Sequence, residues 1–332
     1  TGVQTCALPI SINILPNNYD RLAQMGLFVD RPQRFRSIIV EQQNGVLTLL
    51  PTMPVGSPGT VGVRGQRTGN TVTELLPAPA PLDQGRNLGA WEVALRHMPA
   101  PGLSVYGKAG TSFRVATVDE NRFLVSLLEP QKSRDGELGA EYRTGALHLR
   151  TALFRMDLTN EIYFSPLFPP FGANVNLSPT RREGLEAETS WAPVADLRLF
   201  ANLSVTSAKF RSGVYGGTDV SGKDVPLVPH HLLSLGATWQ VAAATRLGAV
   251  VRHVGAQRFD NDQANAFRPM PEYATVDFSA SHEAGGWLVT GALRNAFNNR
   301  YFSYGIVNGA GTGFNAYPAA ERNVMVSEYR FR

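Results

Sequence analysis

The chain has 332 residues, of which 43% are hydrophobic and 17% charged, and no stretch approaches the roughly 20 apolar residues of a membrane-spanning helix, which excludes a helical membrane bundle. The formal net charge is +4, but lysine and arginine are scattered rather than clustered into a patch, so we expect no nucleic-acid partner. The one cysteine, Cys6, excludes an intramolecular disulfide and a thiolate metal site.

The first 88 residues carry the weakest pattern. Residues 1–10, TGVQTCALPI, resemble a translated sequencing adapter and lack the charged-then-apolar pattern of a secretory signal, so we leave them out of the fold prediction and expect the natural start to be missing. In residues 11–88, strand-like pieces are interrupted by prolines, which are confined to strand edges and bulges. We expect two poorly formed strands and no separate domain there, in a segment that is either barrel or a damaged, frameshifted or chimeric stretch.

Residues 89–332 alternate between short and long connections, each preceded by a strand-like segment of roughly ten residues. The short connections are turns at 99–102, 143–146, 193–196, 241–245 and 283–286. The long connections are loops at 116–135, 165–181, 211–230, 255–272 and 295–321. Outer-membrane barrels have short periplasmic turns and longer extracellular loops, so the alternation predicts an all-β, antiparallel transmembrane β-barrel and assigns a side to each connection.

The predicted strands have two chemically different faces. In residues 197–206 one face carries Leu197, Leu199, Ala201, Leu203 and Val205, and the other carries Arg198, Asn202, Ser204 and Thr206. Glu186 and Glu188 share the polar face of the preceding strand, as expected of a wet lumen, because a carboxylate in hydrocarbon is costly. Three residues depart from the alternation: Phe200 and Leu232 fall on the polar face and His253 on the apolar face.

Several passages of the chain resemble the C-terminal part of the TonB-dependent outer-membrane receptors. They are LSVYGKAGTSFRVATVDE at 103–120, residues 129–164, residues 178–210, VPLVPHHLLSLGATW at 225–239, LRNAFNNRYFSYG at 293–305 and RNVMVSEYRF at 322–331. The resemblance implies a barrel of about 22 strands around an N-terminal plug domain, of which residues 89–332 are the C-terminal half with about eleven strands. Plug, TonB-contacting motif and signal peptide are expected to be absent from this chain, and a half barrel with two open edges should not fold stably alone.

The resemblance also implies a function. It predicts an active transporter of the bacterial outer membrane that takes up a scarce nutrient, a ferric siderophore or another iron complex by family frequency. Its partners would be TonB through the missing plug, a small-molecule nutrient complex and outer-membrane lipid, and we expect no cofactor and no enzymatic activity. Two alternatives stay open: a passive porin-like or adhesin barrel, and a soluble all-β enzyme.

Aromatic residues in the long loops are the candidate ligand contacts. Those beside strands, such as Phe164 and Tyr301, are predicted to anchor strand ends at the lipid headgroups. Those deeper in the loops suit stacking against an aromatic or chelated ligand. The predicted ligand-binding residues are Phe168, Phe171, Tyr215, Phe267, Phe314 and Tyr317.

No residue set predicts catalysis or a metal site. We interpret Glu183, Glu186 and Glu188 as solvated lumen charges, paired with Arg155, Arg198 or the plug, rather than as an acid–base pair. The oxygen-rich loop at 260–265 lacks the spacing and the glycine of a recognised calcium loop, so we expect an ordinary polar loop. His230 and His231 are adjacent in a strand entry and point to opposite faces, which makes them poor joint ligands for one metal ion.

Overall fold

The computed structural model describes residues 38–42, 46–50, 59–72, 82–117, 120–121, 127–167 and 172–331, with side chains from residue 87 onward within these ranges. The regular elements in these ranges are all strands. Among the described residues, no helix is long and apolar enough to cross a membrane. The proposed adapter segment at residues 1–10 lies outside the described residues.

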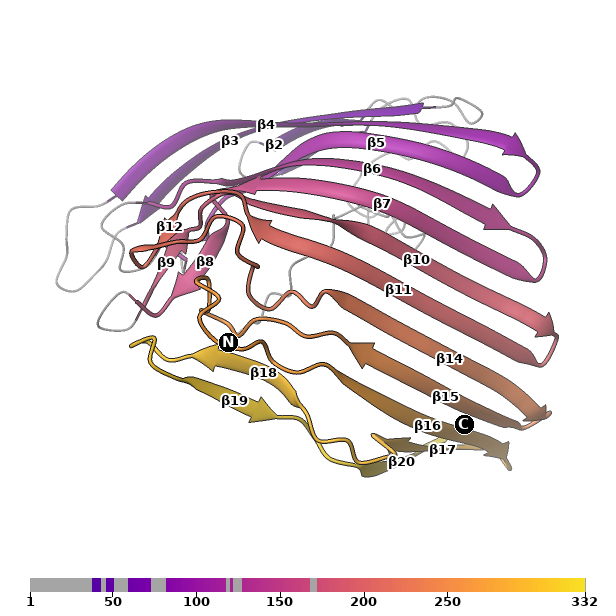
Figure 1. Ribbon diagram of the computed structural model, residues 1–332. Helices are drawn as coiled ribbons and strands as arrows, with labels where there is room; N and C mark the ends of the chain where they lie inside the picture. Colours follow the sequence, from indigo (N-terminus) through magenta and orange to yellow (C-terminus); the bar gives the residue numbers. More distant parts are fainter. Residues whose placement is uncertain are drawn as a thin grey trace.

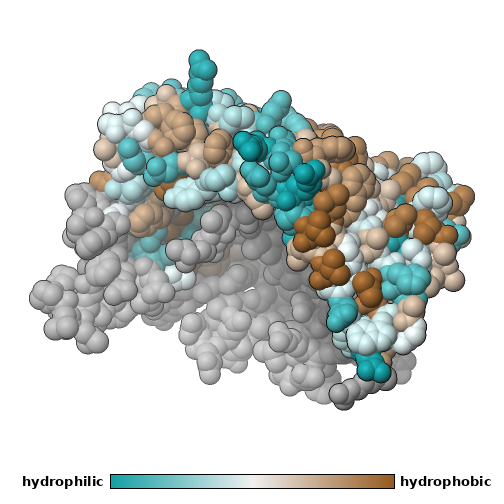
Figure 2. Space-filling view, turned by 90° about the horizontal axis from the view of Figure 1, so that it is seen from below, coloured by the Kyte–Doolittle hydropathy of each residue, from teal (hydrophilic) through white to brown (hydrophobic). Residues whose placement is uncertain are grey.

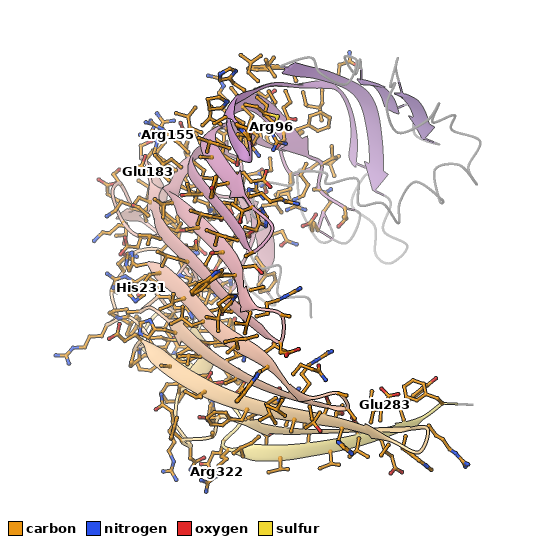
Figure 3. All side chains as sticks on the ribbon, turned by 90° about the vertical axis from the view of Figure 1, so that its right-hand side faces the viewer. Arg96, Arg155, Glu183, His231, Glu283 and Arg322 are labelled. Carbon is orange, nitrogen blue, oxygen red and sulfur yellow. The ribbon has the colours of Figure 1, made fainter. Side chains whose placement is uncertain are left out.

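Fourteen of the described strands form one antiparallel sheet in which each strand pairs with its neighbours in chain order. The strands are β1 (Ile38–Gln42), β2 (Val46–Leu50), β3 (Gly59–Val72), β4 (Leu82–Ala100), β5 (Leu103–Arg114), β6 (Gln131–Arg143), β7 (Leu147–Thr159), β10 (Thr180–Val194), β11 (Leu197–Phe210), β14 (His231–Ala242), β15 (Thr245–Val254), β16 (Tyr273–Ala284), β17 (Trp287–Arg294) and β20 (Asn323–Arg330). The sheet curves into an open arc with a convex and a concave face, and β1 and β20 are its edges (Figures 1 and 3).

The predicted rhythm of connections is confirmed. Each of the short turns joins two paired strands, for example β16 to β17 across residues 285–286, and these turns gather at the right of Figure 1. From β4 to β20 the sheet has eleven strands, the number read from the sequence. The long loops lie at the opposite end and carry small hairpins of their own, β8 (Ile162–Ser165) with β9 (Ala173–Asn176), β12 (Val214–Tyr215) with β13 (Thr218–Asp219), and β18 (Phe302–Val307) with β19 (Phe314–Pro318).

Two strand predictions are wrong. The long loop predicted at 165–181 starts earlier, because β7 ends at Thr159: Asn160 has a φ of 56°, a left-handed conformation that asparagine tolerates and that breaks the strand. The chain then re-forms as β8, outside the large sheet. The region before residue 88 contains β1, β2, β3 and the start of β4 rather than two poor strands, and β3 pairs with β4 along its whole length.

The two faces of the sheet differ in polarity as predicted. The labelled residues in Figure 3 identify the two sides of the sheet: Arg155, Glu183 and His231 lie on the convex side, and Arg96 lies on the concave side. Leu153 lies two residues before Arg155 and therefore on the same, convex face, and it is paired with Leu138 of the neighbouring strand. Leu153 is 56% exposed and Leu138 is 68% exposed. Figure 2 shows such hydrophobic residues, in brown, gathered in patches at the molecular surface rather than enclosed. Large exposed apolar side chains suit a lipid solvent.

The concave face is lined by charged groups that pair with one another. The Tyr106 hydroxyl donates a hydrogen bond of 2.5 Å to Glu137, and the Lys108 ammonium lies 2.8 Å from the same carboxylate. On the preceding strand, β4, Arg96 donates a hydrogen bond of 2.9 Å to Glu141 of β6. Such groups are cheap to keep in an aqueous lumen and costly in hydrocarbon.

Glycines explain one departure from the alternation of the faces. Phe200, on the polar face, pairs directly with Gly236 in the next strand, and a Cβ there would lie 2.1 Å from the Phe200 ring. Tyr106 lies over Gly139 in the same way, 2.3 Å from the Cβ that a larger residue would have. An aromatic ring on the lumen face is thus accommodated by the bare backbone of its cross-strand partner.

Candidate ligand-binding loops

The long loops pack into a small domain-like assembly at one end of the sheet, built on two apolar clusters. The first contains the buried residues Leu177, Ala208, Phe210, Val220 and Val225. Tyr215 packs against it, and its hydroxyl donates a hydrogen bond of 2.6 Å to the Ser165 hydroxyl of another loop. Tyr215 therefore joins two loops through this hydrogen bond. Burial raises the pKa of the Tyr215 hydroxyl.

The second apolar cluster lies between the last two long loops. Phe259, Met270 and Val307 are buried, and Phe267 packs against them. Phe314 stacks on Phe259 with ring centroids 4.3 Å apart and meets Phe267 edge-on at 5.7 Å. Such arrangements are favoured between aromatic rings, so the cluster holds the β18–β19 hairpin against the loop that precedes β16.

A carboxylate, Asp260, connects three loops. It accepts hydrogen bonds from the hydroxyl of Tyr163 in β8 and, at 2.5 Å, from that of Tyr304 in β18. Its backbone N–H also donates to Gly305 at 2.8 Å. Burial, together with the Asp260 charge, raises the pKa of Tyr163 and of Tyr304 well above the ordinary range of a tyrosine. Both tyrosines therefore stay protonated donors at neutral pH.

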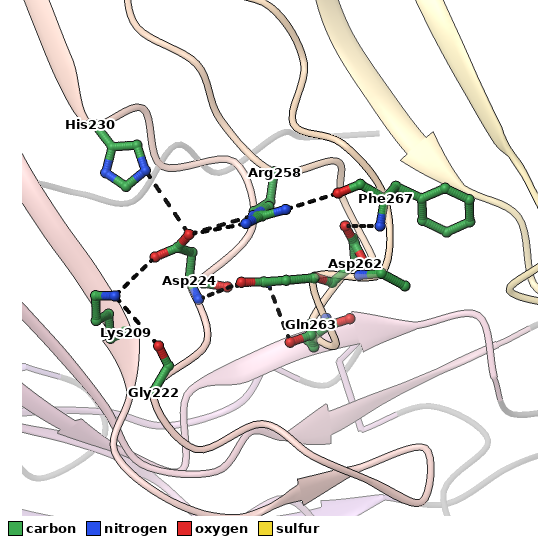
Figure 4. A network of polar contacts seen from close by, with 10 residues as sticks. Lys209, Gly222, Asp224, His230, Arg258, Asp262, Gln263 and Phe267 are labelled. Carbon is green, nitrogen blue, oxygen red and sulfur yellow. Dashed lines mark hydrogen bonds and ion pairs between the residues drawn. The ribbon is translucent and has the colours of Figure 1, made fainter.

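A second acidic centre, Asp224, joins the loop before β14 to the loop before β16 (Figure 4). Its carboxylate lies 3.5 Å from Arg258 and 3.5 Å from Lys209. The side chain of Asn265 bridges to the Asp224 backbone, accepting from its N–H at 2.8 Å and donating to its carbonyl at 2.9 Å. The contacts therefore hold the two loops to one another.

The oxygen-rich loop at 260–265 is held by hydrogen bonds of its own. The Asp262 carboxylate accepts hydrogen bonds from the backbone N–H groups of Ala266 at 2.7 Å and Phe267 at 3.2 Å. Burial raises the pKa of Asp262 although these two donors oppose it. The oxygens of Asp260, Asp262 and Asn265 are thus engaged in holding the loops.

The predicted ligand-binding residues differ in where they lie and in how exposed they are. Phe168 and Phe171 lie outside the described residues. Tyr215 and Phe267 are half-buried in separate clusters, where they support the loops. Phe314 and Tyr317 are 49% and 51% exposed, so much of each ring faces outward. The structure brings Phe267 and Phe314 together, and Tyr317 lies beside Tyr304 with centroids 5.6 Å apart.

Of the three glutamates predicted to face the lumen, one lies on the other face of the sheet. Glu186 and Glu188 share a strand face, and Glu188 lies directly opposite Arg150 in β7. Glu183 pairs with Arg155 and lies with it on the convex side (Figure 3). The prediction that Glu183 faces the lumen is wrong, because its odd number places it on the opposite side of a strand with a two-residue period.

The structure also assembles a group that the sequence did not suggest. His231, His253 and Glu272 each offer one possible metal-ligating atom, and these atoms lie within 4.8 Å of one another. In the sequence, the histidine next to His231 is His230, which points to the other face of the strand. The signal that was available is that His253 breaks the apolar pattern of its face.

A curved antiparallel sheet with a lipid-suited convex face, a charged concave face, and short turns and long loops at opposite ends is the wall of a transmembrane β-barrel. The family model described as TonB dependent receptor-like, beta-barrel, matches residues 59–299. The chain belongs to this family. A second model, phage major capsid protein E, matches residues 5–101 and overlaps the first over 59–101, where β3 and β4 pair continuously with the rest of the barrel sheet.

Similar proteins agree with this assignment. A ferrioxamine receptor of Yersinia enterocolitica is 28% identical over 176 residues, which are 52% of this chain and 23% of that protein. The siderophore receptor PiuA from Acinetobacter baumannii has a TM-score of 0.69 at 15% identity, covering 86% of this chain and 43% of that one. The copper transporter OprC has a TM-score of 0.66 at 16% identity, covering 85% and 46%. The chain thus spans less than half the length of these relatives.

Proposed function

We propose that this chain is the C-terminal part of the barrel of an outer-membrane, TonB-dependent active transporter. The observation that carries the proposal is the family match over residues 59–299 on a sheet with one apolar and one charged face. In this role the convex face contacts outer-membrane lipid and the concave face surrounds a plug domain. The plug would contact TonB.

The proposed cargo, meaning the nutrient transported, is a ferric siderophore or a similar iron complex. This is supported by the ferrioxamine receptor, which is 28% identical to this chain over 176 residues. The copper transporter has the same fold, so the fold alone does not select iron. The cargo therefore has to be tested directly.

The extracellular loops are the proposed capture surface. Phe314 and Tyr317 are the described aromatic candidates that combine a fixed position with exposed ring area, since Phe314 is stacked on Phe259 and Tyr317 packs beside Tyr304. Rings held in place lose little entropy when a ligand stacks on them. An aromatic contact of this kind contributes about 0.5–1.5 kcal/mol, which is roughly a 2- to 12-fold change in Kd.

Growth under iron limitation tests the cargo. A strain that lacks the gene should grow poorly with one siderophore as the sole iron source, with ferrioxamine as the first compound to try, and should recover when the gene is restored. Uptake that depends on the gene but continues without TonB would point to a passive porin-like barrel. Normal growth and uptake with every iron source would count against iron transport.

Binding to the intact receptor tests the capture surface. We expect Phe314→Ala and Tyr317→Ala to weaken binding of the transported complex by the factor given above. Phe278→Ala, which truncates an aromatic ring on the convex face, is the matched control and should leave binding unchanged. Equal effects of all three substitutions would contradict the role of the loop rings.

The soluble-enzyme alternative is not favoured. Side chains such as Leu138, Leu153, Trp191 and Trp239 are exposed on the convex face, which water would not tolerate over so large an area. A passive porin or adhesin would share the strand pattern, but the family match favours the receptor.

A further inference from the structure

Two histidines and a glutamate meet on the convex side of the sheet, at the loop end of three consecutive strands. His231 begins β14, His253 is the penultimate residue of β15, and Glu272 immediately precedes β16. His253 pairs with Leu233, which shares a strand face with His231, so both imidazoles project from the same side. Figure 3 shows His231 on the convex side, away from the concave face.

The three side chains converge closely. The imidazole rings of His231 and His253 are stacked nearly parallel, with centroids 4.9 Å apart and 9° between their planes. The Nε2 atom of each ring lies 3.9 Å from the same oxygen, Oε2 of Glu272. The side chains of His231, His253 and Glu272 are 40%, 29% and 62% exposed, so an ion can reach them from solvent.

This combination of ligand types is suited to a first-row transition metal. Imidazole nitrogen and carboxylate oxygen bind Zn²⁺ at about 2.0–2.2 Å, and three protein ligands with one open position is a common arrangement. Ligand atoms around a tetrahedral ion lie roughly 3.3 Å apart at these bond lengths. The three atoms here are within 4.8 Å, and small rotamer changes of partly exposed side chains would close the difference.

Gly255 leaves room for the His231 ring. It is buried, and a Cβ at this position would lie 2.9 Å from both Cε1 and Nδ1 of His231. Gly255 is not among the residues with positive φ, so its backbone conformation does not itself demand glycine. The missing side chain instead leaves the space in which the His231 ring lies flat and faces His253.

We propose that His231, His253 and Glu272 form a binding site for a divalent transition metal ion, with Zn²⁺ as the representative ion, on the outer rim of the barrel. The bound ion links the loop-side ends of β14, β15 and β16. The site lies on the convex side and does not depend on which cargo the receptor transports.

The intact receptor, purified in detergent without a histidine tag and stripped of metal by a chelator, tests this site by titration with Zn²⁺. We expect His231→Ala and His253→Ala each to remove one Zn²⁺ equivalent or weaken it more than about tenfold, since even outer-shell partners of metal ligands change affinity by about 10- to 100-fold. Glu272→Gln should also weaken it. His230→Ala is the matched control, because that imidazole points to the other face and lies 4.0 Å from Asp224.

A second pair of variants separates positioning from ligation. Gly255→Ala should displace the His231 ring and weaken Zn²⁺ binding while every ligand remains, whereas Gly291→Ala, where an added Cβ meets nothing within 4 Å, should not. Heat-modifiable migration on gels verifies that each variant is a folded barrel.

A measurement on the unmutated protein completes the test. Zn²⁺ should protect His231 and His253, but not His230, from acylation by diethylpyrocarbonate, read residue by residue by mass spectrometry. Equal Zn²⁺ binding by all variants, or no protection of His231 and His253, would overturn the proposal and leave two imidazoles that only pair with the Glu272 charge.

Discussion

Asp260 is the residue on which the loop assembly depends most directly. Its carboxylate accepts hydrogen bonds from Tyr163 and Tyr304, which belong to different loops. Hydrogen bonds to a charged group contribute about 1.5–3 kcal/mol each, and a buried hydroxyl left without an acceptor costs more than an exposed one. Asp260 therefore stabilises the relative position of three long loops.

We expect Asp260→Asn to loosen these loops, because an amide offers one acceptor oxygen where the carboxylate offers two. The measurement is limited proteolysis of the receptor in detergent, in which the long loops should be cut several-fold faster. Asp219→Asn is the control, since Asp219 hydrogen-bonds Ser221 within its own exposed loop. Unchanged cleavage in Asp260→Asn would contradict the linking role.

The same residues predict a response to alkaline pH. The pKa values of Tyr163 and Tyr304 are raised by burial and by Asp260, so an opened loop would lose these protons at lower pH than the packed loop does. Their contribution is fully present below the ordinary tyrosine pKa of about 10 and is lost as the pH rises above it. Loop opening, followed by hydrogen exchange or proteolysis, should increase above that pH.

The control for this effect is a variant that lacks the titrating group. In Tyr163→Phe the alkaline increase in loop opening should be smaller, although opening at neutral pH is larger because one hydrogen bond is missing. An alkaline response of the same size in both proteins would assign it to other residues.

At the scale of the strand, neighbouring strands fit one another through pairs of an aromatic residue and a glycine on the lumen face. Phe200 with Gly236 and Tyr106 with Gly139 are such pairs, directly opposite in register. The ring covers the backbone of the next strand and leaves no room for a Cβ. These contacts help to set the register between strands.

We expect Gly236→Ala to destabilise the barrel by about 1–3 kcal/mol, the usual cost of overpacking, because the Phe200 ring must move. The midpoint of urea unfolding in detergent measures the change. Gly291→Ala, in β17, meets nothing within 4 Å and should shift the midpoint little. A similar shift in both variants would assign the effect to glycine backbone entropy rather than to the ring.

At the scale of the whole molecule, the sheet separates two solvents. Three tryptophans on the convex face lie near the short turns, Trp191 and Trp239 at the ends of β10 and β14 and Trp287 at the start of β17, and all are exposed. Tryptophan rings favour the headgroup region at both membrane interfaces. They therefore indicate the boundary of the apolar band at the end of the sheet that carries the short turns.

A pair of arginine substitutions tests the assignment of the faces. Leu235→Arg, in the middle of β14 on the apolar face, should cost about 2–4 kcal/mol in a bilayer, whereas Ser234→Arg on the lumen face should cost clearly less. Unfolding of the intact receptor in lipid vesicles, followed by tryptophan fluorescence, measures both. A larger loss for Ser234→Arg would reverse the assignment of lipid and lumen.

Much of the fold could be predicted from the sequence. The turns, the strand count from β4 to β20 and the polarity of the faces are local properties, because turn chemistry and a two-residue period act between near neighbours in the chain. The sequence does not predict the break at Asn160, because asparagine can occupy either backbone conformation and loop packing decides which.

The candidate site was predictable only in part. The sequence identified aromatic loops, but whether a ring is exposed, like Phe314, or packed into a loop cluster, like Tyr215, depends on contacts between loops. Tyr163 and Asp260 are 97 positions apart, and nothing in the local pattern of either residue pairs them.

The sequence by itself determined that this protein is the wall of a membrane barrel, because residues that face lipid alternate with residues that face water along the strands. Only the tertiary structure decided which loop side chains hold one another and that His231, His253 and Glu272 meet. The physical reason is that register across strands and packing between loops join residues that are distant in the chain, and such contacts leave no period to read.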